Sequence, residues 1–148
     1  MRRPPIRPIA ISTTRASPCQ PWAAARCVVS WSGERGAKAL ERWRSTAREA
    51  GKQSRRAWFP EVTALHTTAQ VAQLPGTRLV LHEEASQPLS GLALTGDVVL
   101  VVGPEGGIGA EELAALGGAP VRLGPSVLRT STAGAAAAAV VSATTGRW

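Results

Sequence analysis

The chain of 148 residues has few aromatic and few sulfur-containing residues: no tyrosine, one phenylalanine, one methionine and two cysteines. Five tryptophans alone cannot fill a core, so most of the core must consist of aliphatic side chains and alanine. Cys19 and Cys27 are eight residues apart and lack both a CxxC spacing and a histidine at metal-ligand spacing. This excludes a disulfide framework and argues against a structural zinc ion or a catalytic thiol.

Long apolar runs are also missing. No stretch approaches the roughly 20 residues that span a bilayer, and the alanine-rich run at residues 135–141 is far too short. The first eight residues are basic and interrupted by proline, so they are not a secretory leader. The sequence therefore predicts a cytoplasmic protein with no membrane partner.

Several common catalytic motifs are absent. No lysine follows Lys52, which excludes a P-loop. Glycines at 103, 106, 107 and 109 depart from the GxGxxG dinucleotide pattern, and no Ser/His/Asp arrangement suggests a nucleophile elbow. His66 and His82 are sixteen residues apart, so we interpret each as a structural or surface residue and expect no metal site.

Charge is distributed unevenly along the chain. Residues 1–60 hold thirteen Lys and Arg against three acidic residues, whereas residues 61–148 hold four against seven. The basic first part and the faintly acidic second part indicate that one side of the protein binds a polyanion and that another side binds a small molecule. An arginine-rich surface that only faces solvent is the alternative.

The most informative stretch is VVLVVGPEGGIGAEELAA at residues 98–115. Five apolar residues predict a strand buried on both faces. The glycines then predict a loop, and Glu111 and Glu112 open a helix whose dipole favours carboxylates in its first turn. A loop after the carboxyl end of such a strand is where open α/β sheets bind ligands.

Other elements follow from periodicity and turn signals. We expect helices over residues 37–56, 62–73, 111–116 and 127–143, and strands over residues 27–29, 78–84, 98–102 and 120–123. Strands and helices alternate from residue 78 onwards, which predicts an α/β fold with a mainly parallel sheet.

Three motifs together carry a family resemblance. GPEGG at residues 103–107 is followed twenty residues later by LGPSVLRTSTA at residues 123–133, and QSRR at residues 53–56 stands just before Phe59-Pro60. In this combination the sequence resembles the RsmE family of SPOUT-class RNA methyltransferases over roughly residues 22–148. The resemblance implies a parallel sheet with helices on both faces and a C-terminal deep trefoil knot. It also implies a homodimer that uses S-adenosylmethionine to methylate N3 of a uridine in the 16S ribosomal RNA of the small subunit.

The resemblance also assigns site residues. Three segments would converge on the cofactor, and the candidate binding residues are Leu81, His82, Gly103, Pro104, Gly106, Gly107, Ile108, Leu123, Gly124 and Leu128. Glycines allow close approach to the ligand, while the leucines and isoleucine give adenosine apolar walls.

Further roles concern the RNA substrate. Arg129 would hold the anionic uracil or its phosphate, and pairing with Glu105 is its alternative role. Glu105 would brace the loop by accepting backbone N–H bonds, and is the less favoured general base. Arg26, Arg55 and Arg56 are candidate RNA-binding residues. The proton acceptor is left open.

The chain departs from the family pattern in two respects. Ser131 stands where family members carry a glutamate, and neither the family's N-terminal PUA-like β-barrel nor the first strand and helix of its knotted domain is recognisable. We expect residues 1–21 to be disordered or foreign to the fold, and residues 22–148 to form a partial SPOUT domain. Two alternative functions stay open: a truncated remnant that binds RNA or S-adenosylmethionine without catalysis, and a transfer RNA methyltransferase of the same superfamily.

Overall fold

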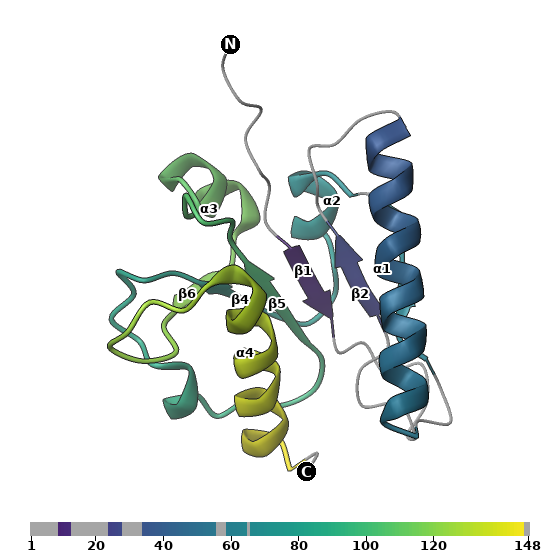
Figure 1. Ribbon diagram of the computed structural model, residues 1–148. Helices are drawn as coiled ribbons and strands as arrows, with labels where there is room; N and C mark the ends of the chain where they lie inside the picture. The colour runs from purple at the N-terminus through teal and green to yellow at the C-terminus, as the bar shows by residue number, and fades with distance from the viewer. Residues whose placement is uncertain (1–8, 13–23, 28–33, 56–58, 65, 147–148) are drawn as a thin grey trace.

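A computed structural model describes residues 9–12, 24–27, 34–55, 59–64 and 66–146. Six strands form one sheet in the order β3-β2-β1-β5-β4-β6, with helices packed around it (Figure 1). The strands are β1 (Ile9–Ser12), β2 (Ala24–Cys27), β3 (Glu61–Val62), β4 (Thr77–Leu81), β5 (Val98–Val102) and β6 (Ala119–Val121). The helices are α1 (Glu34–Gln53), α2 (Thr68–Ala72), α3 (Ala110–Leu116), α4 (Thr130–Thr144) and the 3-10 turn η1 (Leu89–Gly91).

The half of the sheet that follows residue 77 is parallel, as expected. β4 pairs in parallel with β5, from Thr77 opposite Val98 to Leu81 opposite Val102, and also in parallel with β6. All five residues of β5 are buried. The carboxyl ends of β4, β5 and β6 therefore lie at the same edge of the sheet.

Strand β1 adds antiparallel pairs to a sheet that is otherwise parallel, and it corrects the prediction for residues 1–21. It pairs antiparallel with both β2 and β5, with Ile9 opposite Val102 and Ser12 opposite Val99, so the sheet is mixed. Residues 9–12 also belong to the fold, although we expected the whole of residues 1–21 to lie outside it. The physical reason is that a fully buried strand such as β5 needs hydrogen-bond partners along both of its edges.

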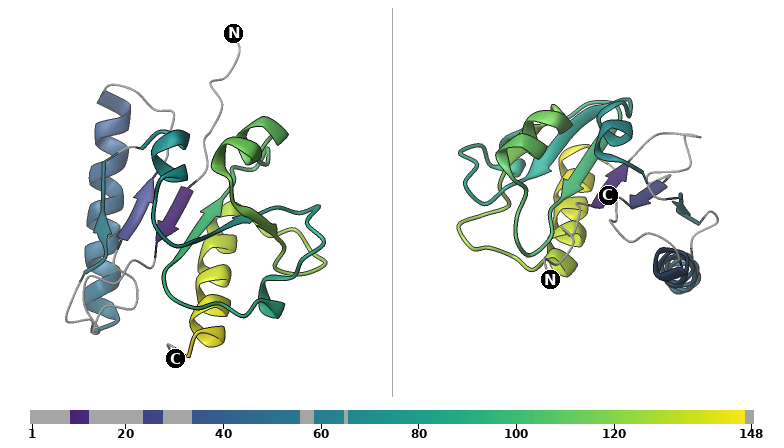
Figure 2. Two further views of the ribbon diagram at one scale, coloured as in Figure 1. Left: turned by 180° about the vertical axis from the view of Figure 1, so that it is seen from behind. Right: turned by 90° about the horizontal axis from the view of Figure 1, so that it is seen from above.

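Helices cover both faces of the sheet, as the resemblance implied (Figure 2). Two apolar clusters fill the space between the helices and the sheet. On one face, α2 and α3 pack through Val71 and Leu116 against Val80, Val99 and Val101. On the other face, the cluster is formed by residues of α4, η1 and the strands: Leu79, Leu89, Val98, Leu100, Val121, Ala137 and Val141. Side chains of β4 and β5 thus alternate between two cores, which fixes their register.

Some element boundaries differ from the sequence prediction. Residues 62–64, 66 and 67 are not helical: Val62 belongs to β3, and α2 begins only after Thr67, whose side chain and that of Gln70 form a capping box. Helix α4 begins at Thr130, three residues later than expected. Helix α1 begins at Glu34 and lies beside β3, where the Arg44 Nε donates to the Val62 carbonyl oxygen at 3.2 Å. No helix in the described ranges is long and apolar enough to cross a membrane.

Candidate active site

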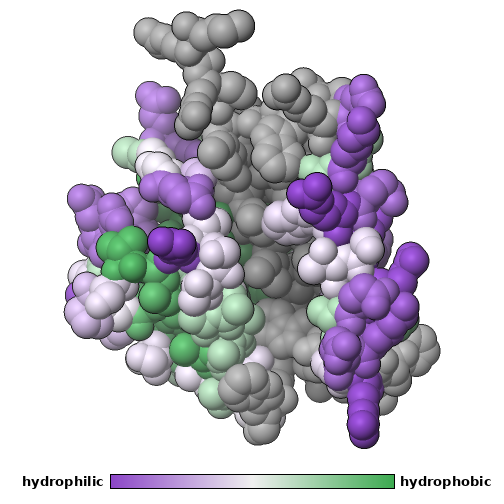
Figure 3. Space-filling model, in the orientation of Figure 1, coloured by the Kyte–Doolittle hydropathy of each residue, from purple (hydrophilic) through white to green (hydrophobic). Residues whose placement is uncertain are grey.

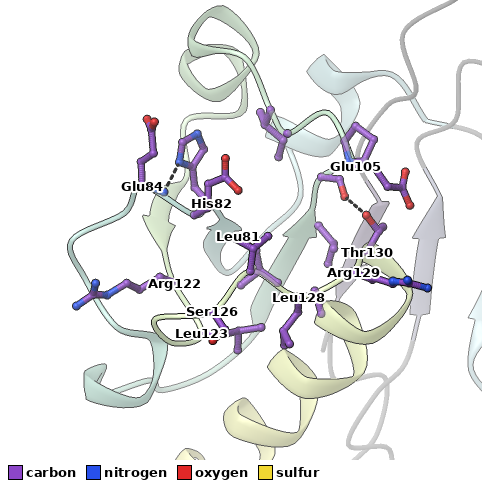
Figure 4. Close-up of a pocket in the computed structure, with 18 of the residues that line it drawn as sticks. Leu81, His82, Glu84, Glu105, Arg122, Leu123, Ser126, Leu128, Arg129 and Thr130 are labelled. Atoms are coloured by element: carbon purple, nitrogen blue, oxygen red, sulfur yellow. Dashed lines mark hydrogen bonds between the residues drawn. The ribbon is translucent and has the colours of Figure 1, made fainter.

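A cavity of about 510 Å³ opens where β4, β5 and β6 end, and its volume is in the range of small-molecule sites. Leu81, Val102 and Val121, the last residues of these strands, line its base. Its walls come from the three segments that follow the strands, residues 82–84, 103–108 and 122–130. Figure 4 shows side chains of all three segments around Leu81 and Leu128.

The first wall is the glycine loop after β5. It is closed by a turn in which the Gly107 N–H donates to the Pro104 carbonyl oxygen at 2.9 Å, and Gly107 has φ +76°, a value that favours glycine. Ile108 folds back against the end of the strand and is buried. A Cβ on Gly103 would lie 2.9 Å from the Ile108 Cγ1, so only glycine fits there.

The second wall is the segment that joins β6 to α4. Arg122 still belongs to the sheet edge, because its N–H donates to Gln87 and its carbonyl accepts from Leu89. Within the described part of the chain, residues 123–128 make no backbone hydrogen bond. The C=O groups of these six residues, and the N–H groups of all of them except Pro125, lie beside the cavity and are free to bind a polar ligand.

The two walls are joined by a side chain. The Thr130 hydroxyl, in the first turn of α4, donates to the Gly103 carbonyl oxygen at 3.0 Å (Figure 4). This bond connects the end of β5 with the start of α4, and therefore sets the spacing between the glycine loop and residues 123–128.

Open space lies beside three glycines of these walls. A Cβ built on Gly106, Gly107 or Gly124 meets no atom within 4 Å, although each residue lines the cavity. Together with the apolar side chains of Leu81, Ile108, Leu123 and Leu128, this forms a cradle with apolar walls and exposed backbone. These features fit a nucleoside.

Comparison with known proteins supports the same interpretation. The family of RNA methyltransferase domains matches residues 13–142. The chain belongs to this RNA methyltransferase family. It is 48% identical over 139 residues to Ribosomal RNA small subunit methyltransferase E of Mycobacterium bovis, covering 86% of this chain and 53% of that protein.

Solved structures agree. The crystal structure of Ribosomal RNA small subunit methyltransferase E from Neisseria gonorrhoeae bound to S-adenosyl methionine matches with a TM-score of 0.74 and 30% identity, over 84% of this chain and 56% of that one. The putative methyltransferase Lpg2936 from Legionella pneumophila, in complex with SAM, matches with a TM-score of 0.71 and 30% identity, over 83% and 56%. The predicted resemblance to RsmE is confirmed, and the chain spans about half the length of these relatives.

The structure of this family member brings together all twelve of the predicted cofactor and catalytic residues. Each lines the cavity: Leu81, His82, Gly103, Pro104, Glu105, Gly106, Gly107, Ile108, Leu123, Gly124, Leu128 and Arg129. Their grouping follows from topology, since they come after neighbouring parallel strands.

The expected role of Glu105 as a loop brace does not agree with the structure. Its side chain is exposed and, within the described ranges, accepts no hydrogen bond, because the Pro104–Gly107 turn already closes the loop through the backbone. Arg129 is exposed too and forms no ion pair with Glu105. In Figure 4 the side chains of Arg129 and Arg122 extend away from the centre of the cavity in opposite directions.

His82 lies at the third segment. Its backbone N–H donates to the Val121 carbonyl oxygen at 2.9 Å, and its ring Nδ1 accepts from the Glu84 N–H at 3.3 Å. In the neutral ring this arrangement places the proton on Nε2. Among the described residues, His, Cys, Asp and Glu nowhere form a group of three that could hold a metal ion.

Of the predicted RNA-binding arginines, only Arg55 has a side chain among the described residues, and it lies outside the cavity. Arg55 follows the end of α1 and is exposed, Arg56 is outside the described residues, and of Arg26 only the backbone, in β2, is described. Sequence reasoning missed Thr130 as a residue that joins the walls. Its position directly after Arg129, within the last motif, is the signal that could have found it.

Proposed function

We propose that the chain forms the cofactor-binding and methyl-transferring part of an enzyme that methylates N3 of a uridine in 16S ribosomal RNA. The observation that carries this proposal is the cavity, which gathers all twelve residues of the family motifs at the carboxyl ends of three parallel strands. Solved relatives at 30% identity with SAM bound support the choice of cofactor.

The residues present fit S-adenosylmethionine. Leu81, Ile108, Leu123 and Leu128 offer apolar contact to an adenine ring, and the unpaired backbone groups of residues 123–128 offer hydrogen bonds to its polar edge. When bound, the cofactor supplies a methyl group that its positively charged sulfur already activates. The glycine loop and residues 123–128 would hold it on either side, and Thr130 would keep these two walls at a fixed spacing.

The remaining work is to place the uracil and to remove its proton. N3 gains the methyl group and loses a proton, so a cation near the ring favours the anionic form of the base. Arg129 and Arg122 are the two cations that line the cavity; Arg129, being exposed and free of ion pairs among the described residues, can turn toward a bound base or phosphate. Glu105, with no hydrogen bond in the described ranges, is available as the proton acceptor, and His82 is a second candidate at the cavity.

The C-terminal segment would form the trefoil knot, and a second copy would complete the site. Val127 is 72% exposed and Leu128 is 40% exposed, although both are apolar and line the cavity. A second copy that covers these side chains would bury this apolar surface and close one side of the cavity.

Arg26, Arg55 and Arg56 would contact the RNA, and the enzyme would act in the cytoplasm.

The test is methyl transfer to small ribosomal subunits that lack the modification. We expect the chain to transfer labelled methyl groups from S-adenosylmethionine, with 3-methyluridine recovered after digestion of the 16S ribosomal RNA. Arg129→Gln is expected to reduce kcat about 10²–10³-fold, as loss of a charge-stabilising group does, with cofactor affinity unchanged. Cofactor binding without methyl transfer would favour the non-catalytic remnant, and 2′-O-methylation of transfer RNA would favour the other alternative.

A further inference from the structure

A row of four cations follows one flank of α1. Arg44, Arg48 and Lys52 are spaced four residues apart, and Arg55 comes three residues later, so at 3.6 residues per turn they share one side of the helix. We call these four residues the basic stripe. All of them are exposed, and the helical cations lie about 6 Å apart along the axis. Figure 3 shows hydrophilic residues along α1, at the right of the molecule and apart from the apolar surface at the left.

The carboxylates of α1 neutralise only half of this stripe, since they pair with Arg44 and Lys52 and leave Arg48 and Arg55. The helix makes three ion pairs, Lys38–Glu34, Arg44–Glu41 and Lys52–Glu49, at 2.7–3.0 Å between side chains that are largely exposed. Arg48 and Arg55 have no carboxylate partner among the described residues. Exposed pairs contribute little to stability and exchange easily, so Lys52 can leave Glu49 for another anion.

Arg55 also has an unusual backbone. Its φ is +50°, the only positive φ of a non-glycine residue in the described ranges. It stands one position past the helix cap, where its N–H donates to the Lys52 carbonyl oxygen at 3.0 Å. Glycine is the residue that usually occupies this position because it adopts the left-handed conformation without strain. Strained residues of this kind cluster at functional sites, so the exposed side chain of Arg55 is a candidate for binding a ligand.

We propose that the basic stripe binds the sugar-phosphate backbone of the substrate RNA, at a distance along the molecule from the methyl-transfer cavity. This inference rests on the proposed function, because it assigns the polyanion to an RNA. The regular spacing of the cations along a straight helix suits the repeated charges of one strand. The stripe would hold and orient the RNA without reading its sequence.

Two other cations of α1 provide a matched control. Lys38 and Arg42 lie on the same helix, are also exposed, and are turned about the helix axis by roughly 80° and 120° from Arg48. Replacing two residues by glutamine removes two charges in either case, and glutamine keeps a good helix propensity. If the overall charge of the chain alone attracted the RNA, both double variants would weaken RNA binding equally.

The experiment measures binding of a labelled, mixed-sequence 20-nucleotide RNA by fluorescence anisotropy over a range of salt concentrations. For single-stranded RNA each lost phosphate contact lowers the slope of log affinity against log salt by about 0.7. Arg48→Gln/Arg55→Gln is therefore expected to reduce the slope by about 1.4, and Lys38→Gln/Arg42→Gln by less than half as much. Equal changes of slope in the two variants would contradict the proposal that the basic stripe binds RNA. The same holds if the wild-type chain binds S-adenosylmethionine but does not bind the RNA.

Two further measurements separate the possible outcomes. Arg55→Gly is expected to weaken RNA binding. It should also raise the unfolding midpoint by about 2–4 °C, because glycine relieves the strain of one residue. A lowered midpoint would show that Arg55 has a structural role and would contradict its place in the stripe. In the second measurement, poly-glutamate is added as a competitor. If Arg48→Gln/Arg55→Gln abolishes poly-glutamate binding but leaves RNA affinity unchanged, the stripe binds an acidic protein instead of RNA. If the wild-type chain binds RNA through the stripe but does not bind S-adenosylmethionine, the proposed function is contradicted and RNA binding by the stripe is still supported.

Discussion

Arg78 is a partly buried cation that joins two helices to the sheet, and replacing it is expected to destabilise the fold severely. Its side chain leaves β4 and donates to three carbonyl oxygens: those of Ala72 and Leu74 at the end of α2, and that of Leu116 at the end of α3. The bonds to Leu116 and Leu74 measure 2.9 and 3.0 Å. The last carbonyl groups of a helix lack partners within the helix and carry partial negative charge, so a guanidinium between two such ends is well placed.

The magnitude follows from these three bonds. A hydrogen bond to a charged group contributes about 1.5–3 kcal/mol, and water can replace part of that at helix ends near the surface. Arg78→Met keeps the apolar stem but leaves all three carbonyl groups without a donor, so we expect a loss of about 3–5 kcal/mol. Because domains are stable by only about 5–15 kcal/mol, this is a large part of the total. Arg78→Lys keeps the charge without the planar fork and should lose roughly half as much.

The assay is urea unfolding followed by circular dichroism, with the free energy of unfolding extrapolated to water. Arg42→Met is the control, since this exposed arginine on α1 has no ion pair among the described residues and should change stability by at most about 0.5 kcal/mol. A loss of less than about 1 kcal/mol for Arg78→Met, with an unchanged denaturant slope, would refute the assigned role of these bonds.

Three further substitutions test other local interactions. Thr130→Val removes the donor to Gly103 and should weaken S-adenosylmethionine binding in a calorimetric titration while costing about 1 kcal/mol of stability; Thr130→Ser should restore both. Gly118→Ala places a Cβ 2.9 Å from the Arg78 Cγ and should cost about 1–3 kcal/mol in urea unfolding, so a neutral result would contradict this close packing. Thr67→Ala removes the capping box of α2 and should lower stability by about 1 kcal/mol, with no change in cofactor affinity.

Local signals in the sequence were sufficient for the elements around the cavity. The run of five apolar residues at β5 has the predicted bounds, and all five are buried. Gly117 ends α3 with φ +61°, as a glycine directly after an alanine- and leucine-rich segment indicates. These features depend on neighbouring residues, so the sequence predicts them well.

Features that depend on distant parts of the chain were not predictable in this way. Strand β1 pairs with residues 99–102, about ninety positions away, and the prolines around it hide its short alternating pattern. Val62 looks helical in sequence but pairs with Ala25 of β2 in the sheet. Tertiary pairing overrides local propensity in both cases.

The candidate site shows the same division. Its lining residues were predictable, because motifs that follow consecutive parallel strands come together at one edge of the sheet. The bond between Thr130 and Gly103 was not, since it depends on where α4 begins relative to the end of β5. The free side chain of Glu105 was also not predictable, because a backbone turn closes the loop without it.

The central claim is that the cavity binds S-adenosylmethionine, and calorimetric titration of the cofactor tests it most directly. Gly106→Val and Gly109→Val are the matched pair: a Cβ at either position meets no protein atom within 4 Å, but only Gly106 lines the cavity. We predict binding by the wild-type chain, loss of that binding in Gly106→Val, and retention in Gly109→Val. A folded wild-type chain that does not bind the cofactor, or equal affinity in the two variants, would contradict the assignment of this cavity.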